Sequence, residues 1–138
     1  MPSALIEYVT TPPFDDAELN ALFASAWDGH RSRTFEPVLK HSLVYVCAYD
    51  GDRLVGFVNV AWDGGKHAFV LDPTVHREYR RRRIATKLLD IAASHAADRG
   101  CEWLHVDYEP HLDPLYRRCG FRHTHAGLLN LRERRCSG

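Results

Sequence analysis

LDPTVHREYRRRRIATKLL, residues 71–89, leads from a strand through a turn into the start of a long helix. The first backbone N–H groups of a helix have no partners within it, and the helix dipole adds partial positive charge there. An anion, above all a phosphate, suits such a place. Five arginines, Arg77 and Arg80–Arg83, surround the turn. The stretch therefore indicates a polyphosphate site, although a run of charges is also typical of a solvated surface.

The helix after the arginines is long and amphipathic. Ile84, Leu88, Ala92 and Ala96 recur at i, i+4 spacing, and Gly100 predicts the C-terminal end. Three apolar strands are predicted before the arginines, at residues 43–49, 53–62 and 67–72. Tight turns join them, so we expect an antiparallel meander. Pro73 cannot donate to a strand ladder, which predicts that pairing loosens at the end of the third strand.

Further elements are expected on both sides of this centre. Residues 4–9 read as a short strand, and a helix follows whose buried face is formed by Leu19, Leu22, Phe23 and Ala26. Residues 27–35 read as a loop, and a short helical piece ends near Lys40. Later elements are a strand at 101–108, a short helix that Asp113 caps, and a final strand within 121–131, mainly 126–131. The order predicts a mixed α/β fold with a crossover helix leading to a parallel strand.

Length and composition limit the class of protein to which the chain can belong. The chain has 138 residues with 45% hydrophobic and 26% charged residues, which predicts one soluble domain over residues 1–138. The formal net charge is zero, which disfavours a broad surface for nucleic acid. No apolar run approaches the roughly 20 residues that span a bilayer, and MPSALIEYV lacks the features of a signal peptide. We therefore expect a cytoplasmic protein.

Cysteines and histidines are scattered. The cysteines are read as reduced thiols, because no CxxC pair is present: Cys47, Cys101, Cys119 and Cys136. His123 and His125 form an HxH pair, but no further ligand is spaced around them as zinc would need. The sequence therefore predicts no metal site.

Residues 71–89 resemble the central motif of the GNAT superfamily of coenzyme-A-dependent N-acetyltransferases, Arg/Gln-x-x-Gly-x-Gly/Ala at a helix start. Arg80 takes the first place and Ala85 the last, whereas Arg83 stands where the family has its middle glycine. The resemblance implies that acetyl-CoA is a cosubstrate and that its pantetheine arm runs along Pro73, Thr74 and Val75. Its pyrophosphate would be held, mostly by backbone N–H groups, over these residues: Arg80, Arg81, Arg82, Arg83, Ile84, Ala85 and Thr86.

A second resemblance lies in DPLYRRCGF, residues 113–121. The family often carries LY-x-x-x-GF on a short helix, which Leu115, Tyr116, Gly120 and Phe121 match. The resemblance implies that Tyr116 donates a proton to the departing thiolate of coenzyme A. The alternative is that Tyr116 only packs the short helix against the sheet.

The general base and the acceptor site are less defined. Strand alternation puts Trp103, His105 and Asp107 on one face of the strand, and Glu109 follows at its end. The resemblance adds that in some relatives a glutamate acts as the base close to the position of His105. His105, Asp107 and Glu109 are therefore candidate bases, with ordinary strand-end residues as the alternative. In the loop after the first helix, Arg31 and Arg33 would suit an acceptor that bears a carboxylate or phosphate, unless the loop is simply solvated.

The resemblance implies a GNAT-like α/β (α+β) fold: a mixed, mostly antiparallel sheet with splayed central parallel strands flanked by helices. It implies an acyltransferase that moves the acetyl group of acetyl-CoA to a primary amine of a small molecule or peptide by direct attack in a ternary complex. No metal, nucleic acid or membrane partner is expected, and a homodimer rests on the resemblance alone. Two alternatives stay open. One is a noncatalytic acyl-CoA sensor, and the other is a nucleic-acid-binding module that uses Arg80–Arg83 with Arg132, Arg134 and Arg135.

Overall fold

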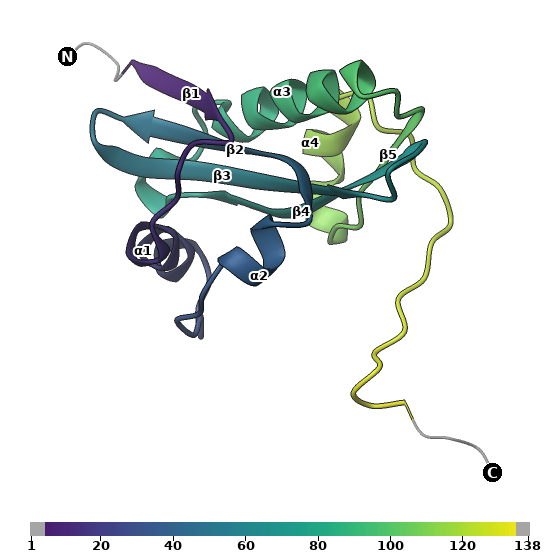
Figure 1. Cartoon of the computed structure of the whole chain (residues 1–138), viewed down its shortest axis with the longest axis horizontal. Helices are drawn as coiled ribbons and strands as arrows, with labels where there is room; N and C mark the ends of the chain where they lie inside the picture. The colour runs from purple at the N-terminus through teal and green to yellow at the C-terminus, as the bar shows by residue number, and fades with distance from the viewer. Residues whose placement is uncertain (1–4, 135–138) are drawn as a thin grey trace. The chain divides into compact units, whose positions relative to one another are not determined.

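A five-stranded sheet organises the first part of the chain (Figure 1). Its strands lie in sequence order: β1 (Ile6–Thr10), β2 (Ser42–Asp50), β3 (Arg53–Trp62), β4 (His67–Val75) and β5 (Trp103–His105). The pairs from β1 to β4 are antiparallel, and β5 is parallel to β4. The computed structural model describes residues 5–134 and divides the chain into two compact units, 1–106 and 107–138. The mixed, mostly antiparallel sheet confirms the predicted fold class.

Helices cover both faces of this sheet. α1 (Asp16–Ala26) and α2 (Glu36–Leu39) lie on one face, and α3 (Ile84–Asp98) lies on the other (Figure 1). Asp15 caps α1 by accepting a hydrogen bond from the Ala17 N–H at 2.7 Å. The buried side of α1 includes Phe23, whose ring centroid lies 5.8 Å from that of Phe57 on β3. Complete burial of such a side chain stabilises the fold by about 1.5–3 kcal/mol, so this face fixes α1 on the sheet.

α3 approaches β3 closely at a glycine. A Cβ atom on Gly56 would lie 3.0 Å from Ile84 Cγ2 and 3.1 Å from Leu88 Cδ1. The predicted apolar face of α3 is confirmed, because Ile84, Leu88 and Ala92 are all buried. Gly56 therefore sets how near the first turns of α3 lie to the sheet.

β4 changes its register against β3 near Pro73. Asn59 pairs with Leu71, whereas Phe57 pairs with Thr74, so β4 has one more residue than β3 between these pairs. Asp72, which precedes Pro73, has a φ of +52°. The extra residue is a β-bulge, which turns and twists the strand. The expected loosening of the sheet at Pro73 is confirmed, although pairing with β3 resumes and continues to Val75.

The second unit contains η2 (Pro110–Leu112) and α4 (Asp113–Arg118). Tyr116 of α4 is buried and stacks on Tyr108 with ring centroids 4.4 Å apart. Gly120 has a φ of +92° and follows the end of the helix, as the sequence predicts.

Three local predictions are wrong. The strand expected at 101–108 covers only Trp103–His105, because β5 pairs with just three residues of β4, the last of them Phe69. Residues 121–130 form no strand, and their apolar pattern has no partner strand to stabilise it. Asp113 does not cap α4: it is the first helical residue, and its carboxylate accepts from the Tyr108 hydroxyl at 2.7 Å. Ala4, Arg135 and Cys136 lie outside the described residues.

Gly56→Ala should destabilise the first unit. The added methyl group would overlap the space of Ile84 and Leu88, and such overpacking costs about 1–3 kcal/mol. Gly65→Ala is the matched control, since its Cβ would meet only the Asp63 carboxylate, at 3.4 Å or more. Urea denaturation of both variants measures the free energy of unfolding. Equal stability of the two variants would show that the approach of α3 does not depend on Gly56.

Candidate functional site

The turn between β4 and α3 is held in place by side chains on neighbouring strands. It contains η1 (Arg77–Tyr79), and the Tyr79 hydroxyl donates a hydrogen bond to Asp50 at the end of β2. His76 Nδ1 accepts from the Glu78 N–H at 3.1 Å, and His76 Nε2 lies 2.9 Å from an Arg53 nitrogen. Burial first, and then the charge of Arg53, lower the pKa of His76, so the ring stays neutral and accepts at one of its two nitrogens. The turn is therefore a fixed platform before α3.

The start of α3 presents unsatisfied backbone donors. Arg83 is the N-cap, has a φ of +59° and makes no capping hydrogen bond through its side chain. Within residues 5–134, nothing accepts a hydrogen bond from the backbone N–H groups of residues 84–86. Donors of this kind, together with the helix dipole, attract an anion, and the anion site at this helix start stays a prediction.

The arginines of the turn fall into two groups. Arg77 pairs with Asp28 at 3.5 Å, Arg80 donates to the Ala26 carbonyl at 3.3 Å, and Arg82 lies over the Tyr79 ring at 4.8 Å. By contrast, the side chains of Arg81 and Arg83 make no ion pair or hydrogen bond with any described residue. Both have positive φ, +65° and +59°. Arg81 and Arg83 are the arginines left available for a phosphate.

β4 continues beyond the residues that pair with β5. The His76 N–H donates to the Val55 carbonyl on β3 at 2.8 Å. Successive N–H groups of a strand point to opposite edges, so the Val75 N–H points away from β3. The last β4 residue paired with β5 is Phe69, so β5 does not reach this position. The parallel pairing of β4 and β5 stops at Phe69 and His105, and a backbone donor directed away from β3 lies beside Pro73 and Thr74.

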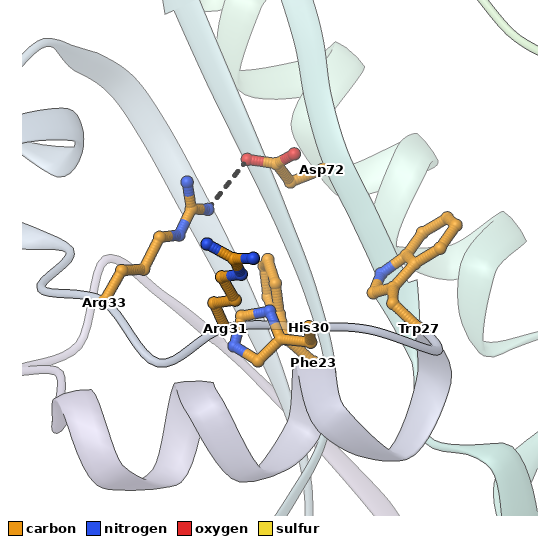
Figure 2. Close-up of a pocket in the computed structure, with 6 residues that line it drawn as sticks. All are labelled: Phe23, Trp27, His30, Arg31, Arg33 and Asp72. Atoms are coloured by element: carbon orange, nitrogen blue, oxygen red, sulfur yellow. Dashed lines mark hydrogen bonds and ion pairs between the residues drawn. The ribbon is translucent and has the colours of Figure 1, made fainter.

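A hollow of about 380 Å³ lies between the α1–α2 loop and β4 (Figure 2). The residues that line it are Phe23, Trp27, His30, Arg31, Arg33 and Asp72. The Trp27 indole N–H donates to the Thr74 hydroxyl at 3.3 Å, and that hydroxyl donates to the Asp72 carbonyl at 2.9 Å. The hollow thus adjoins the β4 segment predicted for pantetheine.

Asp72 is a site residue that sequence reasoning missed. Its carboxylate lies 3.4 Å from Arg33 Nη2 in the hollow (Figure 2). An Asp-Pro pair at the end of a strand is an available signal, because proline there disturbs the ladder. The positive φ of Asp72, however, is visible only in the structure.

The candidate bases are distributed between the two units. His105 lies on β5, where its Nε2 is 2.8 Å from His67 Nδ1 and its ring stacks on Phe69 at 4.6 Å. Asp107 and Glu109 belong to the second unit, where Glu109 lies 3.7 Å from His111. The expected shared strand face of His105 and Asp107 is wrong, because β5 ends at His105.

Tyr116 has the protonation state that a donor needs. Burial raises the pKa of its phenol to about 12, with smaller contributions from Cys119, Asp107 and Tyr108. The hydroxyl therefore keeps its proton throughout the neutral range.

Within residues 5–134, no group of three or more His, Cys, Asp or Glu side chains lies close enough together to hold a metal ion. No helix in this part of the chain has the length and apolar character needed to cross a membrane.

Arg83→Gly should stabilise the apo protein by about 0.5–1 kcal/mol. A residue with a Cβ costs roughly 1–2 kcal/mol in the left-handed region, and glycine removes this cost. Part of the gain is lost because glycine also gives the unfolded chain more conformational freedom. Arg83→Ala removes the same charge but keeps the Cβ, so it should not stabilise the protein. Thermal unfolding of both variants separates the effects. A stabilisation by Ala as large as that by Gly would assign the effect to charge instead of backbone strain.

The fold is shared with known acetyltransferases. A GNAT family acetyltransferase from Streptococcus pneumoniae is 24% identical, with a TM-score of 0.77 over 92% of this chain and 99% of that one. Glucosamine-6-phosphate N-acetyltransferase from Arabidopsis thaliana is 14% identical, with a TM-score of 0.71 over 91% and 97%. The aminoglycoside N-acetyltransferase AAC(6')-Iy in complex with CoA is 17% identical, with a TM-score of 0.77 over 98% of both chains.

The amino-acid sequence gives more direct evidence for the family than the shared fold does. Among curated proteins, none shows significant similarity to it. Residues 8–121 match the Acetyltransferase (GNAT) family, a range that includes the turn, α3 and the LYxxxGF segment. The chain therefore belongs to the GNAT family of acetyltransferases.

Proposed function

We propose that this protein transfers the acetyl group of acetyl-CoA to a primary amine of a small molecule or peptide. One observation carries the proposal: among residues 5–134, the first N–H groups of α3 and the side chains of Arg81 and Arg83 have no hydrogen-bond partner, and they follow directly on the part of β4 that β5 does not pair with. A phosphate group and an extended thioester arm need these two features side by side. The family match and the CoA complex of one structural neighbour support the same cosubstrate.

Each proposed cofactor residue has a distinct task. Pro73, Thr74 and Val75 line the pantetheine arm at the β4 edge. The backbone from Arg80 to Thr86 holds the pyrophosphate, and the guanidinium groups of Arg81 and Arg83, which have no ion pair within residues 5–134, add charge-assisted hydrogen bonds. The Cβ of Arg83 keeps a phosphate away from its backbone, whereas the glycine of the family motif lets the phosphate come close. At this position the charge of the arginine side chain takes the place of that close contact.

Transfer requires a polarised carbonyl, a neutral amine and a stabilised thiolate. The Val75 N–H, at the unpaired edge, donates to the carbonyl oxygen as charge develops on it. Tyr116 gives its proton to the leaving thiolate, a role that follows from the LYxxxGF motif. His105, Asp107 and Glu109 remain the candidate bases that accept the amine proton, directly or through water. The amine attacks directly, so no covalent enzyme intermediate forms.

The proposal treats residues 1–138 as one acetyltransferase domain, because the family match crosses the boundary between the two units. A cytoplasmic location and a homodimer stay predictions. The second candidate function is a noncatalytic acyl-CoA sensor, which one observation favours: Arg83 replaces a glycine at a left-handed position of the cofactor site.

Acetyl-CoA should stabilise the protein against thermal unfolding. At a concentration 100 times the Kd, binding contributes about 2.7 kcal/mol. Arg81→Gln should weaken binding several-fold, because its guanidinium has no other partner in the described chain. Arg99→Gln is the matched control: it removes the same charge at the opposite end of α3. Absence of stabilisation by acetyl-CoA would contradict both candidate functions.

Tyr116→Phe should lower kcat by roughly 100-fold and leave the KM for acetyl-CoA nearly unchanged. The phenol is protonated below its pKa of about 12, so the wild-type rate should show no loss from Tyr116 ionisation between pH 6 and 10. Release of free thiol with a panel of amines measures both quantities. An unchanged rate in the variant would remove Tyr116 from the mechanism. Stabilisation by acetyl-CoA without thiol release from any amine would favour the sensor.

A further inference from the structure

We infer that the hollow between the α1–α2 loop and β4 binds an anionic group of the acceptor, so that the substrates are amines bearing a phosphate or a carboxylate. This inference rests on the proposed function, because it names the acceptor class of the same enzyme. Five of the six lining residues come from α1 and the loop after it, and Asp72 comes from β4 (Figure 2). The volume of about 380 Å³ suits a small molecule.

The loop is fixed by hydrogen bonds instead of being simply solvated. Asn20 of α1 donates to the Arg33 carbonyl at 2.8 Å and accepts from the Arg33 N–H at 3.0 Å. The same amide oxygen lies 2.9 Å from His30 Nε2. Asp16 accepts from the Phe35 N–H at 3.0 Å, and Trp27 is bonded to Thr74 on β4 at 3.3 Å. The backbone that carries both arginines is therefore held at its two ends and in its middle.

The two arginines of the hollow differ in what engages them. Arg33 pairs with Asp72 at 3.4 Å, and its guanidinium carbon lies 4.6 Å from the centre of the Phe35 ring. The Arg31 side chain makes no ion pair or hydrogen bond with any residue in the described range 5–134. The hollow thus contains two guanidinium groups and one carboxylate, which leaves one positive charge uncompensated. Figure 2 shows both guanidinium groups directed toward the Asp72 side of the hollow.

The Arg33–Asp72 pair can yield to a ligand. Its side chains are 42% and 46% exposed, and ion pairs with such exposure contribute only about 0–1 kcal/mol. A phosphate or carboxylate can accept two parallel hydrogen bonds from one guanidinium, which is a stronger arrangement. Arg31 therefore supplies the first contact and Arg33 the second, while the rings of Phe23 and Phe35 lie against the Arg33 guanidinium.

The position of the hollow fits an acceptor. Trp27 joins it to Thr74, and Arg80 of the cofactor turn donates to the Ala26 carbonyl at 3.3 Å. An anion held by Arg31 would leave the amine of a short molecule near the open edge of β4. A polycationic amine would instead meet like charge, which raises the cost of binding.

Direct binding tests the inference without requiring catalysis. Phosphoethanolamine and ethanolamine differ only in the phosphate, and β-alanine and β-alanine amide differ only in the carboxylate. Each is titrated into CoA-saturated protein labelled with ¹⁵N, and the NMR signals of the Trp27 indole N–H and the Arg33 Nε–H are followed. We expect the two anionic amines to shift these signals, with ethanolamine and β-alanine amide binding at least tenfold more weakly. The stronger of the two anionic amines identifies phosphate or carboxylate as the preferred group.

Variants locate the contact. Arg31→Gln should weaken binding of the preferred anionic amine at least tenfold, and Arg99→Gln should leave it unchanged. Equal binding of neutral and anionic amines, tighter binding of spermidine, or an Arg31→Gln variant with wild-type affinity would each overturn the inference. None of these outcomes depends on acetyl transfer. Stabilisation by acetyl-CoA and release of free thiol, measured separately, decide the proposed function.

Discussion

The separation of β4 from β5 is the constraint on which the candidate site depends. The two strands pair only as far as Phe69 and His105, and the bulge at Asp72 and Pro73 then turns β4 while its contact with β3 continues. One extra residue in β4 has three consequences. It frees the Val75 N–H, places the Asp72 carboxylate in the hollow, and directs the chain into the turn before α3. The exposed backbone donor of Val75 and the position of the Asp72 carboxylate therefore both follow from one local irregularity.

The turn can hold an unfavourable backbone because the elements around it are firmly packed. Arg81 and Arg83 both occupy the left-handed region, at a cost of about 1–2 kcal/mol each. Buried apolar side chains at the start of α3 offset this cost, since each contributes about 1.5–3 kcal/mol: Ile84, Leu88 and Leu89. The absence of a side chain on Gly56 lets this packing be close. The packing of the helix face thus offsets the backbone strain at Arg81 and Arg83.

The sequence predicted an element correctly where its local residue pattern and its pairing partner agree. Strong periodicity predicted α1, α3 and the meander, and Pro73 predicted the disturbance in β4. It failed at residues 126–131, because an apolar run forms a strand only when another strand is available to pair with it. It also failed for Asp113, whose carboxylate binds Tyr108 instead of capping the helix. Asp72 was missed because its position in the site follows from a positive φ, which no spacing of residue types reveals.

The chain has zero net charge, yet its first unit contains two clusters of arginine side chains. Arg81 and Arg83 are unpaired at the start of α3, and Arg31 is unpaired in the hollow, as judged within residues 5–134. On the proposed function and the acceptor class inferred from the hollow, an anionic acceptor binds beside a cosubstrate that carries several negative charges of its own. Repulsion between two anions extends over the Debye length of about 8 Å at physiological ionic strength. Separate guanidinium groups for each anion reduce that repulsion locally, and acidic residues elsewhere keep the net charge of the chain at zero.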